Sequence, residues 1–255
     1  MLFTNTSFIG IDPTAGQRPF TYAALDNDCQ LLAIGQGSLE DVLAFVAGQS
    51  QCIVSVCAPR QPNQGIMARP EVRENLSPSP RPGRWTNFRL VEYLLCQHNI
   101  TVPQTRAQVD ACPNWMQMGF ILHNRLAKLG YQVYPSSNGQ RQSMEVYPHA
   151  SYTTILEKIP LPKNSLEGRI QRQLALYDQK INLPDPMRMF EEITRHRLLQ
   201  GILPVNDLCS PGELDALVGA YTAWLAATKP DQITLLGDPD EGQIVLPVPE
   251  LKAHY

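Results

Sequence analysis

Three acidic side chains and one cysteine lie where this chain could carry out chemistry. Asp12 ends an apolar segment, Glu145 precedes Val-Tyr-Pro, and Asp215 lies in an apolar stretch typical of a helix. Carboxylates brought together from strand ends and a helix can hold Mg²⁺ and promote phosphoryl chemistry. The three acids therefore predict a magnesium site, with Mn²⁺ as a substitute. Cys57 also ends an apolar segment, at a position where a fourth acid would fit.

Each acid also has a purely structural interpretation. Asp12 precedes a proline and could be a turn residue that bonds its own backbone. Glu145 could pair with Arg141, and Asp215 could be a solvated helix residue. The neighbours of Asp215 are almost all apolar, which favours a carboxylate that is buried or faces a cleft. No single acid decides the question, but their order along the chain favours a shared site.

Cys57 does not fit a magnesium site. A thiol is a soft ligand, whereas Mg²⁺ requires oxygen atoms. The more natural interpretation is a small buried hydrophobe at a strand end. The alternative, a reactive nucleophile, lacks an identifiable base nearby in the sequence. His149 could act as a base near the metal, or it could simply occupy the first turn of a helix.

Composition sets broad limits. The chain has 255 residues, of which 43% are hydrophobic, enough to build the core of one domain over residues 1–255. Its net charge of -3 at pH 7 excludes a global basic field for nucleic acid. The six cysteines form no CxxC pair and are expected to be reduced thiols. With no signal peptide or apolar span evident, we expect a cytoplasmic protein that does not enter the membrane.

The first part of the chain predicts strands followed by a helix and a further strand. Strands are expected at 7–12, 20–26 and 31–37, with a tight turn between the last two, which favours an antiparallel meander. Ser38 caps a helix through residue 47. Residues 52–57 are apolar enough to form a strand that is buried on both faces.

Residues 58–86 form a proline- and arginine-rich segment with little apolar periodicity, which predicts a long loop. Residues 60–89 contain six arginines and two glutamates, together with the aromatic side chains of Trp85 and Phe88. Arginines combined with aromatic rings suit phosphates and unpaired bases. The residues expected to contact nucleic acid are Arg60, Arg81, Arg84 and Arg89. The alternative is a flexible solvated loop. Separately, Arg89 and Glu92 are spaced at i and i+3, which favours a salt bridge on a helix surface over a functional site.

The rest of the chain predicts a second group of elements. Helices are expected at 87–97 and 114–129, followed by a strand at 144–147. A helical insertion is expected over 160–205, with helices at 165–180 and 187–200. The chain should end with a helix from the Ser210 cap to 227 and a C-terminal hairpin over 232–248. This order predicts an α/β fold of the ribonuclease H-like type. In it, three antiparallel strands lead into parallel strands, and helices flank the mixed sheet. Right-handed crossovers would place Asp12 and Cys57 on neighbouring strands.

Five segments carry a family resemblance. They are Phe-Ile-Gly-Ile-Asp at 8–12, Val-Cys-Ala-Pro at 56–59, Glu-Val-Tyr-Pro-His-Ala at 145–150, Leu-Asp-Ala-Leu at 214–217 and the hairpin segment 237–247. Together they resemble domain-of-unknown-function family 429, a group of predicted ribonuclease H-like nucleases, over nearly the whole chain. The resemblance implies acids at Asp12, Glu145 and Asp215. It also implies Asp-Ala-Pro where this chain has Cys57, which removes one expected metal ligand.

Three functions follow as hypotheses. The first is a Mg²⁺-dependent nuclease that hydrolyses phosphodiesters and is impaired by Cys57. The second is a non-catalytic module that binds nucleic acid or a nucleotide through the arginine-rich segment. The third is an actin-like phosphotransferase, because Gly-Ile-Asp-Pro-Thr at 10–14 resembles a first phosphate loop. That superfamily normally needs two duplicated domains, and this chain shows no repeat.

Overall fold

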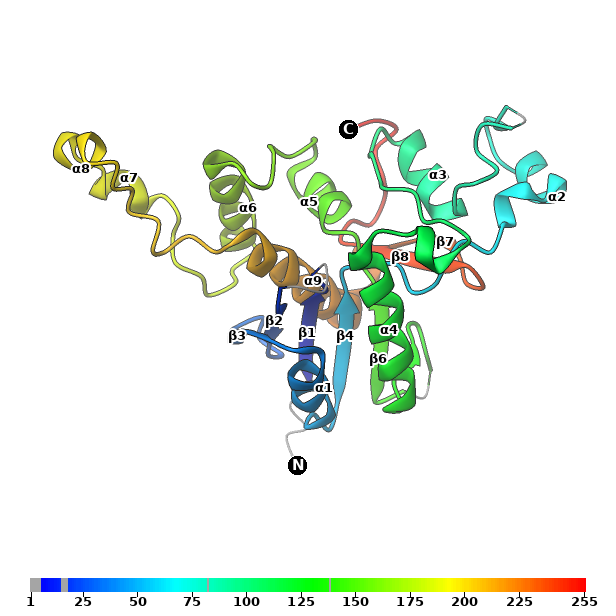
Figure 1. The fold of residues 1–255 in the computed structure, drawn as a ribbon, viewed down its shortest axis with the longest axis horizontal. Helices are drawn as coiled ribbons and strands as arrows, with labels where there is room; N and C mark the ends of the chain where they lie inside the picture. Colours follow the sequence, from blue (N-terminus) through cyan, green and yellow to red (C-terminus); the bar gives the residue numbers. More distant parts are fainter. Residues whose placement is uncertain (1–5, 15–17, 82, 138) are drawn as a thin grey trace.

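The computed structural model describes residues 6–14, 18–81, 83–137 and 139–255. One mixed sheet of eight strands forms the centre of this described part (Figure 1). The strands are β1 (Ser7–Asp12), β2 (Phe20–Leu25), β3 (Leu31–Gly37), β4 (Cys52–Val56), β5 (Gln132–Val133), β6 (Arg141–Glu145), β7 (Thr234–Asp238) and β8 (Gly242–Leu246). Their order across the sheet is β3-β2-β1-β4-β6-β8-β7, and β5 pairs with β6.

The strand directions confirm the predicted fold class. β1, β2 and β3 form an antiparallel meander, whereas β4 and β6 run parallel to β1. Ile11 pairs with Val56, and the Cys57 amide donates to the Ile11 carbonyl at 2.8 Å. Asp12 and Cys57 therefore leave neighbouring parallel strands at the same edge, as the crossover rule predicts. This is the ribonuclease H-like arrangement, with helices on both faces.

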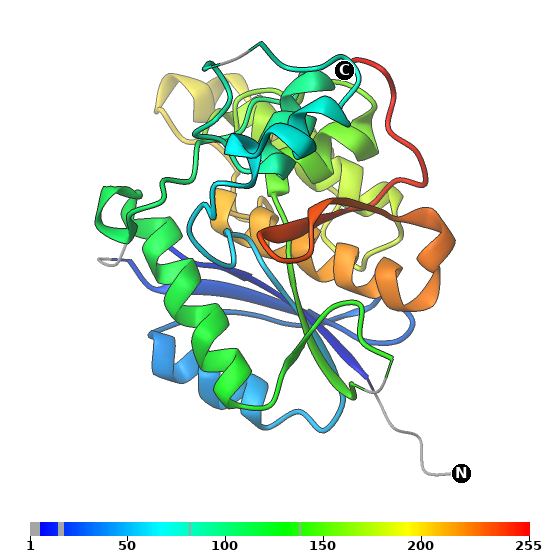
Figure 2. The ribbon, with the colours of Figure 1, turned by 90° about the vertical axis from the view of Figure 1, so that its right-hand side faces the viewer.

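The helices are α1 (Leu39–Ala47), α2 (Pro70–Glu74), α3 (Leu90–Gln97), α4 (Asn114–Lys128), α5 (Pro148–Leu156), α6 (Leu166–Asp178), α7 (Arg188–Glu192), α8 (Arg195–Leu199) and α9 (Pro211–Thr228). α1 and α4 cover one face of the sheet, while α9 covers the other with α5 and α6 beside it (Figure 2). α9 is buried over most of its circumference, which explains why its sequence lacks a polar face.

Several predicted boundaries differ from the structure. The predicted loop at 58–86 contains a 3-10 turn (Ile66–Ala68) and α2. The predicted strand at 144–147 is β6, which ends at Glu145, before the residues that lead into α5. The C-terminal hairpin is present, but Glu145 pairs with Ile244, so the hairpin extends the main sheet. The short β5 had no sequence signal.

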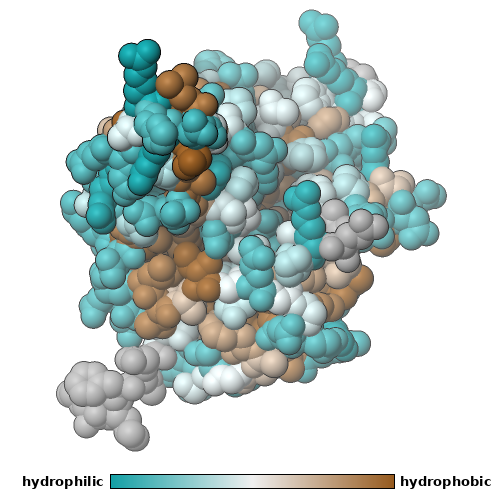
Figure 3. Space-filling model, turned by 60° about the vertical axis from the view of Figure 1, so that its left-hand side comes forward, coloured by the Kyte–Doolittle hydropathy of each residue, from teal (hydrophilic) through white to brown (hydrophobic). Residues whose placement is uncertain are grey.

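The helical insertion consists of α6, α7 and α8. The helix predicted at 187–200 is two short helices, because Thr194 has extended backbone and caps α8 by accepting from the Arg197 amide. Large apolar side chains are exposed here, the most exposed being Leu199 at 74%. Figure 3 shows hydrophobic patches on this side of the molecule. Among the described residues, no helix is long and apolar enough to cross a membrane.

Candidate active site

Asp12 and Asp215 line the same cavity, which lies at the carboxyl end of β1 and has a volume of about 1130 Å³. This is the edge of an open α/β sheet where ligands usually bind. The cavity wall also contains Cys57, Lys163, His149 and Arg172. The structure thus brings together two of the three acids that the sequence singled out.

The start of α9 fixes the position of Asp215. Ser210 caps the helix by accepting from the Glu213 amide, and the Glu213 carboxylate accepts from the Ser210 amide at 2.6 Å. The buried Tyr152 hydroxyl donates to the Leu214 carbonyl at 2.8 Å. These contacts hold the first two turns of α9 and leave Asp215 only 5% exposed. The Ser210 cap predicted from the sequence therefore helps to position this acid.

Lys163 forms an ion pair with Asp215. Its Nζ lies 2.7 Å from Asp215 Oδ2, and the lysine side chain is 50% exposed while that of Asp215 is almost fully buried. Lys163 lies in the segment between α5 and α6 and lines the same cavity. Sequence reasoning missed this residue. Its position in the Pro-Leu-Pro-Lys-Asn segment gave no sign that it would reach α9.

The pKa values of both cavity acids are raised. Burial raises the pKa of Asp12 to about 7, the negative charge of Asp215 adds to this, and Lys163 opposes it. Burial also raises the pKa of Asp215, against the lowering effect of Lys163. A pair of carboxylates that is strained in this way gains from a bound cation, because a cation removes the repulsion. Such perturbed pairs are typical of functional sites.

Two further basic residues face the cavity. Arg172 is 3% exposed, and its Nη1 donates to the carbonyls of Leu161 and Gly168. Its guanidinium lies over the Tyr152 ring, 5.3 Å from the ring centroid. His149, in the first turn of α5, has its pKa lowered by burial and then by Arg172 and Lys163, which favours a neutral ring. The cavity wall therefore carries both acidic and basic side chains.

Cys57 lies beneath the acid pair. Its thiol donates to the Asp215 carbonyl at 3.3 Å. Burial, followed by the charges of Asp12 and Asp215, raises the pKa of the thiol well above its usual range. A neutral thiol is neither a nucleophile nor a ligand for Mg²⁺. Cys57 therefore packs as a small buried residue that touches the cavity.

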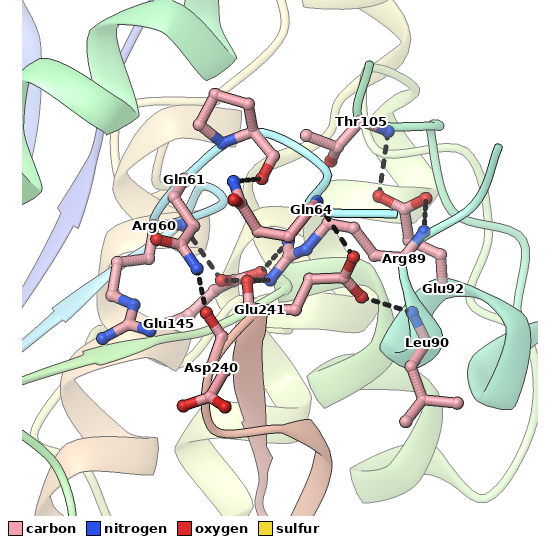
Figure 4. A network of polar contacts seen from close by, with 11 residues as sticks. Arg60, Gln61, Gln64, Arg89, Leu90, Glu92, Thr105, Glu145, Asp240 and Glu241 are labelled. Atoms are coloured by element: carbon pink, nitrogen blue, oxygen red, sulfur yellow. Dashed lines mark hydrogen bonds and ion pairs between the residues drawn. The ribbon is translucent and has the colours of Figure 1, made fainter. Parts of the chain in front are cut away.

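Glu145 does not line this cavity. Its carboxylate, 4% exposed, accepts two bonds from Arg89, from Nη1 at 2.7 Å and from Nη2 at 2.9 Å, and a third from the Arg60 amide (Figure 4). The alternative partner, Arg141, instead donates to backbone carbonyls. With both oxygens engaged by an arginine, Glu145 anchors the segment after β4. The structure thus gives it a different role from the predicted one of metal ligand.

Arg89 differs from its predicted role in nucleic-acid contact for the same reason. It is 1% exposed, and its guanidinium is bonded to Glu145 and to the Glu241 carbonyl. The expected surface salt bridge with Glu92 is absent from the described residues. Glu92 is buried, and its carboxylate accepts from the amides of Arg89 and Thr105. This buried network was missed because it joins segments far apart in the chain.

Glu241 completes the network and was also missed. It is 1% exposed, and its carboxylate accepts from the amides of Gln64 and Leu90 (Figure 4). It also accepts from the amide of Ile66. The turn between β7 and β8 therefore holds both ends of the arginine-rich segment. The sequence offered one sign that Glu241 has a structural role. It precedes a turn glycine and lies in a segment that carried the family resemblance.

The other predicted contact residues lie outside this network or at its edge. Arg60 Nη2 donates to the Pro239 carbonyl at 2.9 Å. Arg81 and Arg84 are exposed, and the Arg84 guanidinium lies 5.2 Å from the centroid of the Trp85 ring. Trp85 itself packs edge-on against Phe88 and Tyr93. Arg81 and Arg84 are thus free to meet an anionic partner, whereas Arg60 is partly committed to the hairpin.

The donor chemistry of the acid pair can be compared with what Mg²⁺ requires. Proteins commonly bind Mg²⁺ through one or two carboxylates, with waters and substrate oxygens filling the other positions. Asp12 and Asp215 supply two carboxylates, and the neutral thiol of Cys57 adds none. In the part of the chain that the structure describes, no group of three His, Cys, Asp or Glu side chains could hold a metal ion. The cavity wall therefore supplies two carboxylates, and any further ligands of a cation would be water or substrate oxygens.

Comparison with protein families gives one result. The model of the family described as protein of unknown function (DUF429) matches residues 10–241, so the chain belongs to this family. The match begins just before Asp12 and ends at Glu241, and thus includes the cavity acids and the buried network. Searches of curated proteins and of solved structures returned no match.

Proposed function

We propose that this member of the family is a Mg²⁺-dependent phosphodiesterase that acts on nucleic acid. The observation that carries the proposal is the pair of carboxylates, Asp12 and Asp215, in one cavity with Lys163 and Arg172. Buried acids that repel each other favour a divalent cation, and the adjacent basic groups favour an anionic substrate.

Each of these residues has a separate role in the proposed reaction. Asp12 and Asp215 would hold the cation, which when bound stabilises negative charge on the phosphoryl oxygens. Lys163 and Arg172 line the same wall and favour a phosphate beside the acids. The Glu145–Arg89 pair does not touch the substrate but fixes the segment after β4.

Two further features favour nucleic acid as the substrate. The half-buried aromatic rings of Trp115 and Tyr147 line the cavity and offer faces on which bases can stack. Arg81 and Arg84 lie outside the cavity and could contact the backbone of a longer chain. The volume of about 1130 Å³ exceeds what a drug-sized ligand needs, which suits more than one nucleotide unit.

The second candidate is a module that binds nucleic acid or a nucleotide without cleaving it. Cys57 favours this alternative, because it leaves the cavity with two acids where the family resemblance implies more. The actin-like phosphotransferase remains a third hypothesis, and the absence of ATP binding would reject it.

A cleavage assay separates these functions. Labelled single-stranded and double-stranded DNA and RNA are incubated with Mg²⁺, Mn²⁺ or EDTA, and ATP binding is measured in parallel. We expect metal-dependent cleavage that is lost in Asp12→Asn and Asp215→Asn and kept in Asp28→Asn, which changes an exposed acid outside the cavity. Binding without cleavage would support the non-catalytic module. Cleavage that survives in both active-site variants would reject the proposed site.

A further inference from the structure

The segment that carries Lys163 is clamped to α6. The Leu161 amide donates to Gln171 Oε1 at 2.8 Å, and the Leu161 carbonyl accepts from Arg172 Nη1 at 2.7 Å. A Cβ atom at Gly168 would lie 1.9 Å from the Pro162 carbonyl oxygen, so only glycine allows this close approach. The backbone next to Lys163 is therefore fixed on both sides of Pro162.

The Lys163–Asp215 pair differs from an ordinary surface ion pair because the backbone next to the lysine is held in place. Exposed pairs contribute little because two flexible side chains must be held in water. Here Asp215 is almost fully buried, and the backbone next to Lys163 is held in place. The ammonium group still lines the cavity, and the lysine side chain is half exposed. Lys163 thus presents a positive charge beside Asp215 from a backbone segment that is held in place.

The charges around the cavity suggest what Lys163 does. Asp12 and Asp215 supply two carboxylates, and the third side chain at this edge of the sheet is Cys57, whose thiol is a poor ligand for Mg²⁺. A second divalent ion would have to share these two carboxylates with Lys163, whose ammonium already bonds Asp215. The ammonium bonded to Asp215 therefore lies where a second positive charge would be useful for a phosphoryl substrate.

We infer that Lys163 takes the place of a second metal ion and donates a hydrogen bond to a non-bridging oxygen of the substrate phosphate. This inference rests on the proposed function and adds a one-cation, one-lysine site to it. Lys163 keeps its proton throughout, so its contribution is electrostatic. When no substrate is bound, the ammonium bonds Asp215 and competes with Mg²⁺ for that carboxylate.

Calorimetric titration tests the inference with two probes, Mg²⁺ alone and inorganic phosphate with and without saturating Mg²⁺. The variants are Lys163→Met, Lys163→Arg and, as a matched control, Lys158→Met, which removes an exposed lysine outside the cavity. We expect Lys163→Met to bind phosphate at least about tenfold more weakly, because a charge-assisted hydrogen bond is lost. It should also bind Mg²⁺ more tightly, since the competing ammonium is gone. Lys163→Arg should stay within a few fold of wild type, and Lys158→Met should not change.

The outcomes separate this inference from the proposed function. Phosphate binding that is equal in Lys163→Met and Lys158→Met would overturn the inference, as would undetectable phosphate binding by the wild type with Mg²⁺. If Mg²⁺ binding and cleavage do not depend on Lys163, the proposed hydrolase is kept and the proposed role of Lys163 is rejected. If the protein binds no Mg²⁺ but its phosphate binding depends on Lys163, the proposed hydrolase is rejected. Lys163 is then only a contact for anions. If Lys163→Met shows no cooperative melting transition, Lys163→Gln is compared with Lys163→Arg in the same titrations.

Discussion

Gly10 on β1 lies directly against the Ala216 carbonyl of α9. A Cβ atom at Gly10 would be 1.8 Å from that oxygen and 2.5 Å from the Ala220 amide nitrogen. Both neighbours are helix backbone, which cannot move aside as a flexible side chain can. Asp12 follows Gly10 by two residues and Asp215 precedes Ala216, so this close contact lies beside both cavity acids.

Substitution Gly10→Ala should therefore weaken both the fold and the site. Overpacking a core contact typically destabilises by about 1–3 kcal/mol, and here the added methyl group meets backbone atoms. Urea denaturation measures the loss of stability, and calorimetry should show weaker Mg²⁺ binding as α9 moves away. The control is Gly48→Ala, where a Cβ atom would make only ordinary contacts and φ is -70°. If the two variants have equal stability, the packing argument is wrong.

Removal of Arg89 should be among the most damaging changes in this chain. Arg89→Met leaves the buried Glu145 carboxylate without its partner, and breaking a buried pair costs about 3–5 kcal/mol. The exposed pair of Arg125 and Glu40 provides the control, and Arg125→Met should cost less than about 1 kcal/mol. Adding Glu145→Gln to Arg89→Met should recover part of the loss, since no charge is then left unpaired. Equal losses in the two arginine variants, measured by urea denaturation, would contradict this account.

The sequence predicted the edge of the sheet where the cavity lies but not the whole of its wall. Asp12 and Cys57 could be placed together because crossover handedness follows from strand order. Asp215 could be assigned because an acid in an apolar helix must be paired or face a cleft. The partner of Glu145 could not be predicted, because Arg89 arrives from a segment whose path depends on Glu241, far along the chain. Lys163 was missed for a similar reason, since the clamp on its segment exists only once α6 has packed.

His123 on α4 should make the protein sensitive to acid. The residue is 5% exposed, and neither ring nitrogen has a hydrogen-bond partner among the described residues. Burial lowers its pKa from 6.5 to about 4, so between these values the unfolded chain binds a proton that the folded chain does not. Stability should therefore fall as pH decreases from about 6.5 to about 4, by up to about 1.4 kcal/mol per pH unit from this group.

His123→Leu should flatten the fall in stability over that pH interval. Urea denaturation at several pH values between 4 and 7 measures the slope for wild type and variant. The control is His254→Gln, which changes an exposed histidine and should leave the slope as it is in wild type. An unchanged slope in His123→Leu would mean that other groups cause the acid sensitivity.

Replacing Cys57 by Asp should create a site that depends more strongly on metal. The new carboxylate would lie beside Asp215, whose carbonyl now accepts from the thiol, and would face the cavity. Without metal, a third buried negative charge repels Asp12 and Asp215, so the apo variant should melt at a lower temperature than wild type. Mg²⁺ should recover this loss by binding the folded state, by about 2.7 kcal/mol at a concentration 100 times Kd. Cys57→Asn has nearly the same shape without the charge, so its melting temperature should respond to Mg²⁺ no more than that of wild type. Equal metal responses in the Asp and Asn variants would show that position 57 cannot contribute a ligand.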